Sequence, residues 1–472
     1  MSVSQIAIVW FRKDFRTDDN PALSEATKIW NILPVYIIDE NNCSTRKPGK
    51  AARIWIARSL IDLNKSLDHH LKIYSGDTIT ILKTLLSHYK AEALYWNTTY
   101  DPKQDKYDEQ MKTEILKYYP NITVRNFNAR LLWDPSELRK KNGDTYRLFT
   151  AFKNKVMEEQ LEPRLPIPPP VEIRYCKEIK IAELVSVTPQ NIIKDKDHRF
   201  EQGIDRKWKI SEKDAHTLLQ DFVDKKLENY HIDRDYPAKN GTSNLSPYIN
   251  FGQISPNRIW FSIARFFPQS MQFLTELLWR EFAYGILSTN PELDSKNLQQ
   301  KFDYFPWEND KEKFKLWSQG TTGYSIVDAG IRELLSTGHM HNRVRMIVGS
   351  FLTKNLLIHW KYGENFFWEH LVDADPASNT FNWQWIAGSG ADSVPYFRIF
   401  SPTMQIKKFD PQLQYIYKWL PEYSSMCSTP VRLQKKRQTP VELVVDEKVS
   451  RKKALTAFRI ANIMYRKNSL IP

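Results

Sequence analysis

Short apolar runs rich in β-branched residues recur through the first 130 residues, and segments with helical spacing separate them. The runs are almost continuously hydrophobic, as expected for strands buried on both faces of a sheet. Strands that alternate with helices pair in parallel and carry helices on both faces. The sequence therefore predicts a doubly wound parallel sheet, an α/β fold. Its strands are predicted at 6–11, 32–38, 71–74, 93–96 and 122–127, with helices at 51–67 and 78–89 among the segments between them.

The pattern changes beyond residue 130. Residues 160–205 hold Pro163, Pro166 and a run of prolines at 168–170, followed by a polar stretch with little periodicity, which is typical of a linker. Helical spacing then dominates to the end of the chain. We predict an α/β domain at 1–130, an interdomain linker at 131–205 and a large all-helical domain at 206–472. Helices of the last domain are predicted at 212–229, 255–267, 271–287, 311–319, 326–337, 343–358 and 452–465.

The length and composition restrict the class of protein. A chain of 472 residues with 41% hydrophobic content can form more than one core. It has no apolar run long enough to cross a membrane, and the N-terminus enters the first predicted strand without a basic leader. The cysteines Cys43, Cys176 and Cys427 lie far apart, which argues against a disulfide framework or a cysteine metal site. We expect a cytoplasmic protein with no membrane partner.

Basic residues outnumber acidic ones by 68 to 55, and the excess is concentrated near the C-terminus. From residue 405 onward the chain has 14 basic and 5 acidic residues. Such a surface favours a polyanion such as nucleic acid as a partner. A solvated basic surface that only improves solubility explains the same charge.

Residues 373–400 gather chemically active side chains in a stretch that fits neither a strand nor a regular amphipathic helix. Two acids, Asp373 and Asp375, precede the amide of Asn379 and the indoles of Trp383 and Trp385. One interpretation is an ordinary core segment, in which the tryptophans are buried and the acids cap a helix. The other is a binding site.

A second motif leaves the first predicted strand at residues 10–23. Two arginines, Arg12 and Arg16, flank Asp14, and a proline follows a capping residue at the start of a helix. Capping explains the proline but not the paired arginines. This motif and residues 373–400 resemble the photolyase/cryptochrome family, most closely its bacterial class I members, which act on cyclobutane pyrimidine dimers. The resemblance covers essentially the whole chain and implies a monomer that binds FAD and UV-damaged DNA.

The resemblance implies that FAD lies in the helical domain, and no Gly-x-Gly-x-x-Gly fingerprint follows the first predicted strand. The loop at 241–248 offers small hydroxyl side chains and backbone N–H groups, although a helix-capping loop has the same composition. In the family, Arg345 pairs with Asp373, and an amide at the position of Asn379 faces N5 of the flavin and favours repair. The FAD contacts implied in this sequence are Tyr230, Thr242, Ser243, Leu245, Ser246, Arg345, Asp373, Asp375 and Asn379.

Glu276 and Trp279 are three residues apart in a predicted helix and therefore share one face. A glutamate beside a tryptophan is usually a solvated residue next to a core one. By resemblance, the tryptophan stacks on a flipped-out dimer and the glutamate binds its polar edge, because an extruded base requires a stacking surface and a hydrogen-bonding partner. The other residues implied to contact the dimer or DNA are Arg234, Asn342, Arg343, Met346, Trp385 and Arg398.

Three further tryptophans, Trp307, Trp360 and Trp383, match the electron-transfer chain that leads from the surface to the flavin in this family. Seven of the fifteen tryptophans lie between Trp279 and Trp385. Sequence spacing does not establish that their rings approach one another, so three separately buried indoles remain an alternative.

The second, light-harvesting chromophore of the family is less defined here. Members that bind folate have an Asn-Glu pair where this chain has Lys103-Gln104, which disfavours folate. The region of 51–53 is closer to members that use a deazaflavin, and an empty second site fits equally well. The sequence as a whole predicts a light-dependent photolyase that repairs cyclobutane dimers by electron transfer from excited reduced FAD. The alternatives are a cryptochrome photoreceptor without repair activity and an electron-transfer flavoprotein that does not bind DNA.

Overall fold

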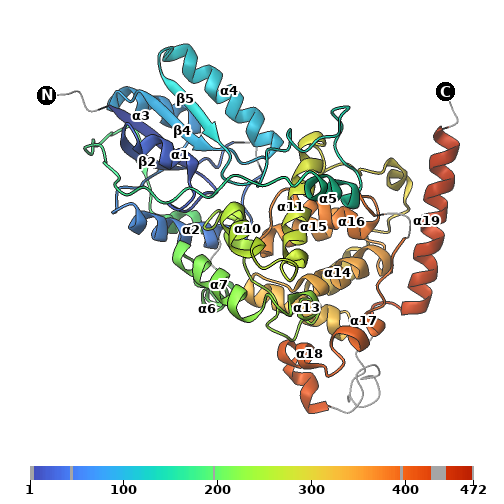
Figure 1. Cartoon of the computed structure of the whole chain (residues 1–472). Coiled ribbons are helices and arrows are strands. Elements are labelled where there is room, and N and C mark those ends of the chain that lie inside the picture. The colour runs from blue at the N-terminus through green and yellow to red at the C-terminus, as the bar shows by residue number, and fades with distance from the viewer. Residues whose placement is uncertain (1–4, 43–45, 195–196, 394–396, 427–442, 470–472) are drawn as a thin grey trace.

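The computed structural model describes residues 5–42, 46–194, 197–393, 397–426 and 443–469. Its first part is a six-stranded sheet with the strand order β5-β4-β1-β2-β3-β6 (Figure 1). Strands β1 to β5 are all parallel, and β6 joins the edge antiparallel to β3. The order reverses between β1 and β4, which defines a doubly wound sheet. The predicted α/β class is confirmed.

The five predicted strands are present with small shifts at their ends. They are β1 (Ile6–Phe11), β2 (Asn31–Ile38), β3 (Lys72–Ser75), β4 (Ala93–Asn97) and β5 (Thr123–Phe127). The helices between them are α1 (Pro21–Thr27), α2 (Lys50–Ser66), α3 (Thr78–Tyr89) and α4 (Pro102–Tyr118). The segment predicted as a linker is partly ordered, because β6 (Val185–Ser186) hydrogen-bonds to β3 and α6 (His198–Lys207) packs on α13. The boundaries at 130 and 205 remain our proposal.

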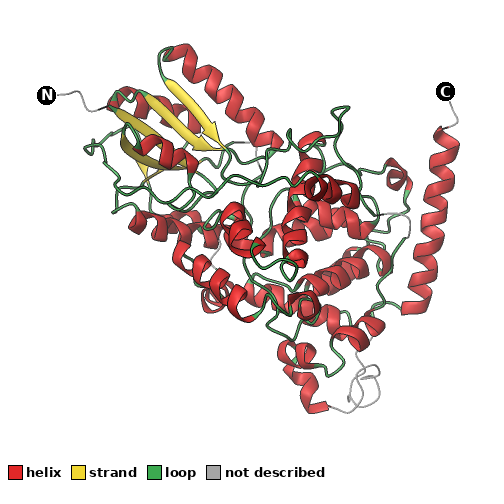
Figure 2. Cartoon of the chain, viewed as in Figure 1, coloured by secondary structure: helices red, strands yellow, loops and turns green. Residues whose placement is uncertain are grey.

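The rest of the chain is helical and forms a second, larger body (Figure 2). Its first helices are α5 (Phe149–Glu158), α7 (Glu212–Lys225), α8 (Tyr230–Asp233), α9 (Ser246–Asn250), α10 (Pro256–Ala264), α11 (Met271–Thr289), α12 (Lys311–Ser318) and α13 (Ser325–Thr337). They are followed by α14 (Asn342–Ser350), α15 (Trp360–His370), α16 (Ser378–Ala387), α17 (Pro402–Phe409), α18 (Gln414–Trp419) and α19 (Glu447–Ser469).

One predicted helix is wrong in its second half. We expected a single helix over 343–358, but α14 ends at Ser350 and continues as a π-helical turn, Phe351–Asn355. The chain then leaves the helix at Leu357, whose φ is 51°. Apolar spacing continues through this segment because all of it is buried, and hydrophobic periodicity does not distinguish an α-turn from a π-turn.

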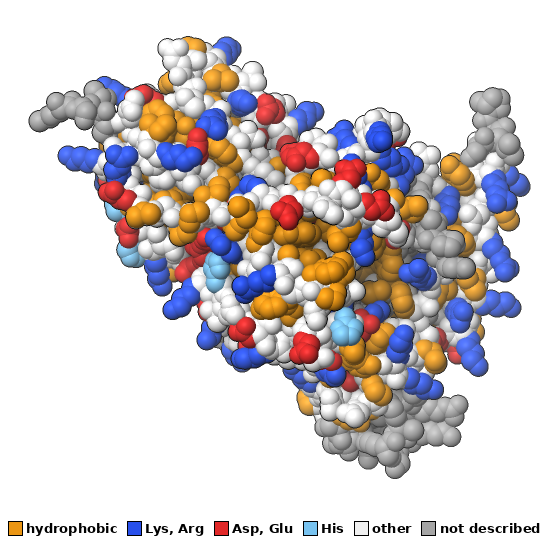
Figure 3. Space-filling view, viewed as in Figure 1, with side chains coloured by type: hydrophobic (Ala, Val, Ile, Leu, Met, Phe, Trp, Pro, Cys, Tyr) orange, Lys and Arg blue, Asp and Glu red, His pale blue; other side chains and the backbone are white. Residues whose placement is uncertain are grey.

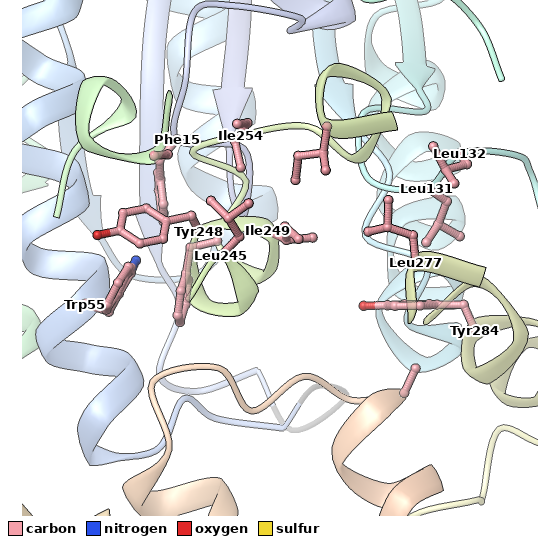
Figure 4. Packing of buried hydrophobic residues seen from close by; sticks show 14 of the residues in the cluster. Phe15, Trp55, Leu131, Leu132, Leu245, Tyr248, Ile249, Ile254, Leu277 and Tyr284 are labelled. Atoms are coloured by element: carbon pink, nitrogen blue, oxygen red, sulfur yellow. The ribbon is translucent and has the colours of Figure 1, made fainter. Parts of the chain in front are cut away.

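The two bodies share one hydrophobic core. Trp55 of α2 is fully buried, and its ring contacts Tyr248 and Phe251 of the helical body at centroid distances of 5.0 and 6.0 Å. Its indole N–H donates to Oε1 of Gln253 at 2.8 Å. Figure 4 shows how Trp55 and Phe15 meet Tyr248 at this junction. The sheet therefore positions the helical body directly, rather than through a flexible tether.

Within the described residues, no helix is long and apolar enough to cross a membrane. Cys176 is buried and free, whereas Cys43 and Cys427 lie outside the described residues. Figure 3 shows Lys and Arg side chains over the whole visible face, and hydrophobic side chains gathered over the middle of the helical body.

Candidate active site

A cavity of about 480 Å³ lies among α11, α14, α15 and α16 of the helical body. It brings together side chains that are more than 160 residues apart in the sequence. Of the predicted site residues, those that line it are Arg234, Glu276, Trp279, Asn342, Arg343, Arg345, Met346, Asp373, Asn379, Trp383, Trp385 and Arg398.

Aromatic side chains form part of the cavity wall. The ring of Trp279 is half-buried and stacks on Phe149 with centroids 3.6 Å apart and planes within 9°. Trp385 is also half-buried, and its indole N–H donates to the carbonyl of Asp392 at 3.2 Å. The guanidinium of Arg398 lies 5.6 Å from the centre of the Trp385 ring. The cavity therefore offers two orientationally fixed indoles, which suits a planar aromatic ligand.

Charged groups beside these rings are already paired. Glu276 forms an ion pair with Arg234 and also accepts from Nε2 of Gln272 at 2.9 Å. Arg343 donates to Asp235 at 2.5 Å and lies over the ring of Phe409 at 4.3 Å. The polar wall is thus set in position before any ligand arrives.

A second group of residues lines the cavity around Asp373. Arg345 donates two hydrogen bonds to this carboxylate, from Nη1 to Oδ1 at 3.0 Å and from Nη2 to Oδ2 at 2.8 Å. Ser246 donates to the same Oδ2 at 2.7 Å, which ties the loop before α9 to the cavity. Burial opposes ionisation of Asp373, but the charge and hydrogen bonds of Arg345 outweigh it and hold the pKa of Asp373 below its usual range.

Asn379 of α16 is held by a buried glutamate of α15. Its Nδ2 donates to the side chain of Glu364 at 2.7 Å and to the Glu364 backbone carbonyl at 3.1 Å. A carboxylate only accepts hydrogen bonds, so this contact fixes which end of the amide is the NH₂ group. The carbonyl Oδ1 of Asn379 is then the end that remains available to the cavity.

Other predicted cofactor residues lie outside the cavity lining. Asp375 is buried and accepts from the backbone N–H groups of Ala377 and Ser378, at the start of α16. Tyr230 is buried and packs between Phe222 and Phe273. Thr242 and Ser243 are half-buried, and Leu245 is fully buried in the loop that reaches Ser246. For Asp375, Tyr230, Thr242, Ser243 and Leu245, contact with a cofactor remains a prediction.

Of the three tryptophans of the predicted chain, Trp360 begins α15, Trp383 lies in α16 and Trp307 lies in the segment before α12. Trp383 contacts Phe367 at 4.9 Å and Trp317 at 6.4 Å. Trp360 is fully buried, and the ring of His359 lies 5.3 Å from it and 5.0 Å from Trp307. Trp307 and Trp360 do not line the cavity, whereas Trp383 does.

The residues present fit a flavin. Two donors of the cavity-lining arginines, Nη2 of Arg280 and Nε of Arg343, are buried and have no hydrogen-bond partner in the described structure. Buried polar atoms are rarely left unpaired, so these donors fit the carbonyl oxygens or phosphates of a bound ligand. Together with the Asn379 carbonyl and the Arg345–Asp373 pair, they match a ring that presents both donors and acceptors.

Several side chains of this site were missed by sequence analysis. Phe149 and Glu364 act through contacts that span many residues, and nothing local marks them. Arg280 follows Trp279 directly in a predicted helix, which is the one local signal for it, and the structure shows that its side chain is 90% buried. Arginine is almost never that buried without a partner.

His341 determines how α14 begins, and with it the position of Asn342, Arg343, Arg345 and Met346. Its Nδ1 accepts from the backbone N–H of Arg343 at 3.2 Å, so the cap requires a neutral imidazole. Burial lowers the pKa of His341 to about 4, below its unfolded value of about 6.5.

We expect the free energy of unfolding to fall as the pH drops from about 6.5 toward 4, because the unfolded state then binds a proton that the folded state does not. His341 alone accounts for about 3 kcal/mol of this loss. His341→Asn keeps a capping side chain without a titrating group, so urea unfolding at pH 7 and pH 5 should show a smaller difference than in the parent. His88→Asn, on the exposed side of α3, serves as the control. An unchanged pH dependence in His341→Asn would contradict the assignment.

The chain matches two sequence families that are parts of one protein class. Residues 7–171 match the family described as DNA photolyase, and residues 273–459 match the FAD binding domain of DNA photolyase. The chain therefore belongs to the photolyase/cryptochrome family.

Individual relatives agree with this. The deoxyribodipyrimidine photo-lyase of Agrobacterium fabrum is 42% identical over 89% of this chain and 88% of its own. Cryptochrome-2 of Arabidopsis thaliana is 33% identical over 90% of this chain and 72% of its own. Among solved structures, a bacterial class III photolyase from Agrobacterium tumefaciens superposes with a TM-score of 0.89 at 39% identity, over 97% of this chain and 98% of that one. The class I assignment made from the sequence is therefore not confirmed.

Proposed function

We propose that this protein is a deoxyribodipyrimidine photo-lyase, which repairs cyclobutane pyrimidine dimers in DNA under light. One observation carries the proposal: a single cavity is lined by the two indoles of Trp279 and Trp385 and also by the carbonyl-presenting amide of Asn379. The indoles suit flipped-out bases, and the amide suits a reduced flavin. A cavity that serves both would bring substrate and cofactor together.

FAD, when bound, supplies the absorption of light and the electron that splits the dimer. The protein's own residues bind, orient and exclude water. Trp279 and Trp385 provide stacking surfaces for the two bases. Glu276, ion-paired with Arg234, is a hydrogen-bond acceptor and suits a base N–H, whereas the amide of Asn342 can donate to a base carbonyl.

The test is direct. The purified protein is examined by absorption spectroscopy for a bound flavin and is then illuminated with dimer-containing oligothymidine under reducing conditions. We expect flavin absorption and loss of dimers in the light but not in the dark. A flavin-loaded protein that leaves dimers intact would exclude the repair function.

A cryptochrome-type blue-light photoreceptor is the second candidate. Relatives named cryptochrome are 31–33% identical to this chain over about nine tenths of its length. A photoreceptor requires FAD but no base-stacking surface for a lesion, so the indole of Trp279 favours repair. Comparing the affinities for irradiated and intact DNA separates the candidates.

We expect DNA binding to be largely electrostatic, so affinity should fall linearly with salt on logarithmic axes. Arg343 lines the cavity, and its side chain is 19% exposed. If Arg343→Ala removes one phosphate contact, the slope of this plot should fall by roughly one unit. Lys28→Ala, at the residue that follows α1 in the other body, should leave the slope unchanged. An unaltered slope in Arg343→Ala would exclude Arg343 from the DNA interface.

We also propose a second, aromatic chromophore at the carboxyl ends of the parallel strands. A cavity of about 180 Å³ lies there, lined by Trp10, Arg12 and Tyr107 among others. Trp10 Nε1 and Arg12 Nε are buried without a hydrogen-bond partner in the described structure, so the site suits an acceptor-bearing ring. In doubly wound sheets, ligands bind at this edge, outside the carboxyl ends of the strands.

The identity of that second chromophore can be determined by releasing it from the protein. Lys103, which stands where folate-binding members carry an acidic pair, is engaged in an ion pair with Asp294 at 2.6 Å, and this disfavours folate. Chromophores released by denaturation are separated and identified by mass, with deazaflavin and folate standards. Retained stoichiometric folate would overturn our preference for a deazaflavin, and release of FAD alone would overturn the proposed second chromophore. We also propose that the protein is a cytoplasmic monomer. Light scattering, which measures the molar mass in solution, tests whether it is a monomer.

A further inference from the structure

We propose that Arg46, which belongs to the loop before α2 of the α/β body, is a positioning residue that fixes the orientation of Asn379 in the flavin cavity. It acts through Glu364 and does not itself line the flavin cavity. The inference rests on the proposed binding of FAD in this cavity, and it adds a control of the flavin by the other body of the protein.

Arg46 and Glu364 form a two-pronged, buried ion pair. Nη1 of Arg46 donates to Oε1 of Glu364 at 2.6 Å, and Nη2 donates to Oε2 at 2.9 Å. The Glu364 side chain is only 2% exposed, so this two-pronged pair lies almost wholly out of water. A buried carboxylate that loses its paired cation is strongly destabilised, and it must rearrange or take up a proton.

The loop is held firmly on α15, so Arg46 has little freedom to leave. Its guanidinium lies 4.0 Å from the centre of the Trp368 ring, and the Trp368 indole donates to the carbonyl of Lys47 at 2.9 Å. A side chain at Gly49 would place a Cβ 2.1 Å from the carbonyl oxygen of Trp368. Only glycine allows the two backbones to approach so closely.

Glu364 connects Arg46 to the flavin cavity through its hydrogen bond with Asn379. Its Oε1, which binds Arg46, also accepts from Nδ2 of Asn379 at 2.7 Å and from the hydroxyl of Thr380 at 3.1 Å. While Glu364 is a carboxylate paired with Arg46, it can only accept, so the NH₂ group of Asn379 must face it and the carbonyl must face the cavity. Without Arg46, a protonated Glu364 can donate to the Asn379 carbonyl, and the amide can turn over at the cost of its 3.1 Å bond to the Glu364 backbone carbonyl.

The orientation of the Asn379 amide determines which redox form of the bound flavin is stabilised. The reduced ring carries N–H at N5, whereas the oxidised ring presents a bare acceptor nitrogen there. A carbonyl at this position stabilises the reduced form, and an NH₂ group stabilises the oxidised form. Arg46 therefore raises the reduction potential of the bound flavin from outside the cavity.

The test compares the flavin midpoint potential, measured by spectroelectrochemistry, in FAD-loaded parent and variants. Arg46→Gln should lower the reduced-to-oxidised ratio at a fixed ambient potential by about tenfold, which is about 30 mV for two electrons. Arg58→Gln is the matched control, because Arg58 of α2 also forms a two-pronged pair, with Asp205 at 3.1 and 2.9 Å, and lines neither the flavin cavity nor the strand-end cavity. It should leave the potential unchanged.

A double variant tests whether Arg46 affects the flavin potential through Asn379. In an Asn379→Ala background, Arg46→Gln should shift the potential no further, because the residue that carries the effect is gone. An unshifted potential in Arg46→Gln, an equal shift in Arg58→Gln, or a shift that persists without Asn379 would each overturn the proposal. If Arg46→Gln does not retain FAD, Glu364→Gln is measured instead, and a potential equal to the parent's overturns the proposal, since a glutamine amide can donate to the Asn379 carbonyl as a protonated Glu364 does. Absence of FAD from the parent would refute the proposed function itself, which is a different result.

Discussion

Replacing Trp383 with phenylalanine should abolish the light-driven reduction of oxidised FAD and leave repair by chemically reduced enzyme nearly intact. Trp383 lines the cavity and is 3% exposed, so it is the predicted tryptophan placed to contact a flavin there. A phenyl ring is far harder to oxidise than an indole, so the variant lacks the first donor while keeping an aromatic side chain. Photoreduction is followed by the decay of oxidised-flavin absorbance under blue light with an external reductant.

The structure supports a path from Trp383 toward Trp360. A Cβ on Gly363, one helical turn after Trp360 in α15, would lie 2.1 Å from the Trp383 ring, so this indole packs directly on the backbone of that turn. The control is Trp260→Phe in α10, which removes a buried indole that does not line the cavity and should leave photoreduction intact. Loss of both photoreduction and repair in Trp383→Phe would instead indicate a structural role for Trp383.

The second large effect is expected on recognition of damage. Trp279→Ala should weaken the discrimination between dimer-containing and intact DNA by about 1–3 kcal/mol, roughly 5- to 150-fold, the value of one base–aromatic stack. One face of this indole is stacked on Phe149, so a base can use the opposite face. Competition binding with irradiated and intact oligonucleotides measures the ratio.

Two comparisons make the result specific. Non-specific DNA affinity should persist, because it comes from phosphate contacts. Trp419→Ala removes a half-buried indole of α18 that does not line the cavity, and it should leave discrimination intact. If the parent protein shows no preference for dimers, or if Trp279→Ala keeps the full preference, the repair function fails and the photoreceptor becomes the better proposal.

Local sequence determined the architecture of the first body. Continuous apolar runs gave all five parallel strands, and the helix predicted at 78–89 coincides with α3 (Thr78–Tyr89). These elements are predictable because strand and helix periodicities depend on near neighbours along the chain, and because a sheet buried on both faces admits little polar substitution. Motifs quoted from residues 10–23 and 373–400 were likewise enough to indicate the family.

The tertiary structure alone decided how the cavity is built. Phe149 stacks on Trp279 across 130 positions, and Arg46 reaches Glu364 across 318. It also decided that the predicted helix 343–358 breaks at Ser350, and that a segment expected to be a linker adds a strand to the sheet. Neither kind of feature leaves a local signal, because such contacts depend on packing between elements distant in sequence. The sequence supplied the chemical groups, and folding determined which of them meet.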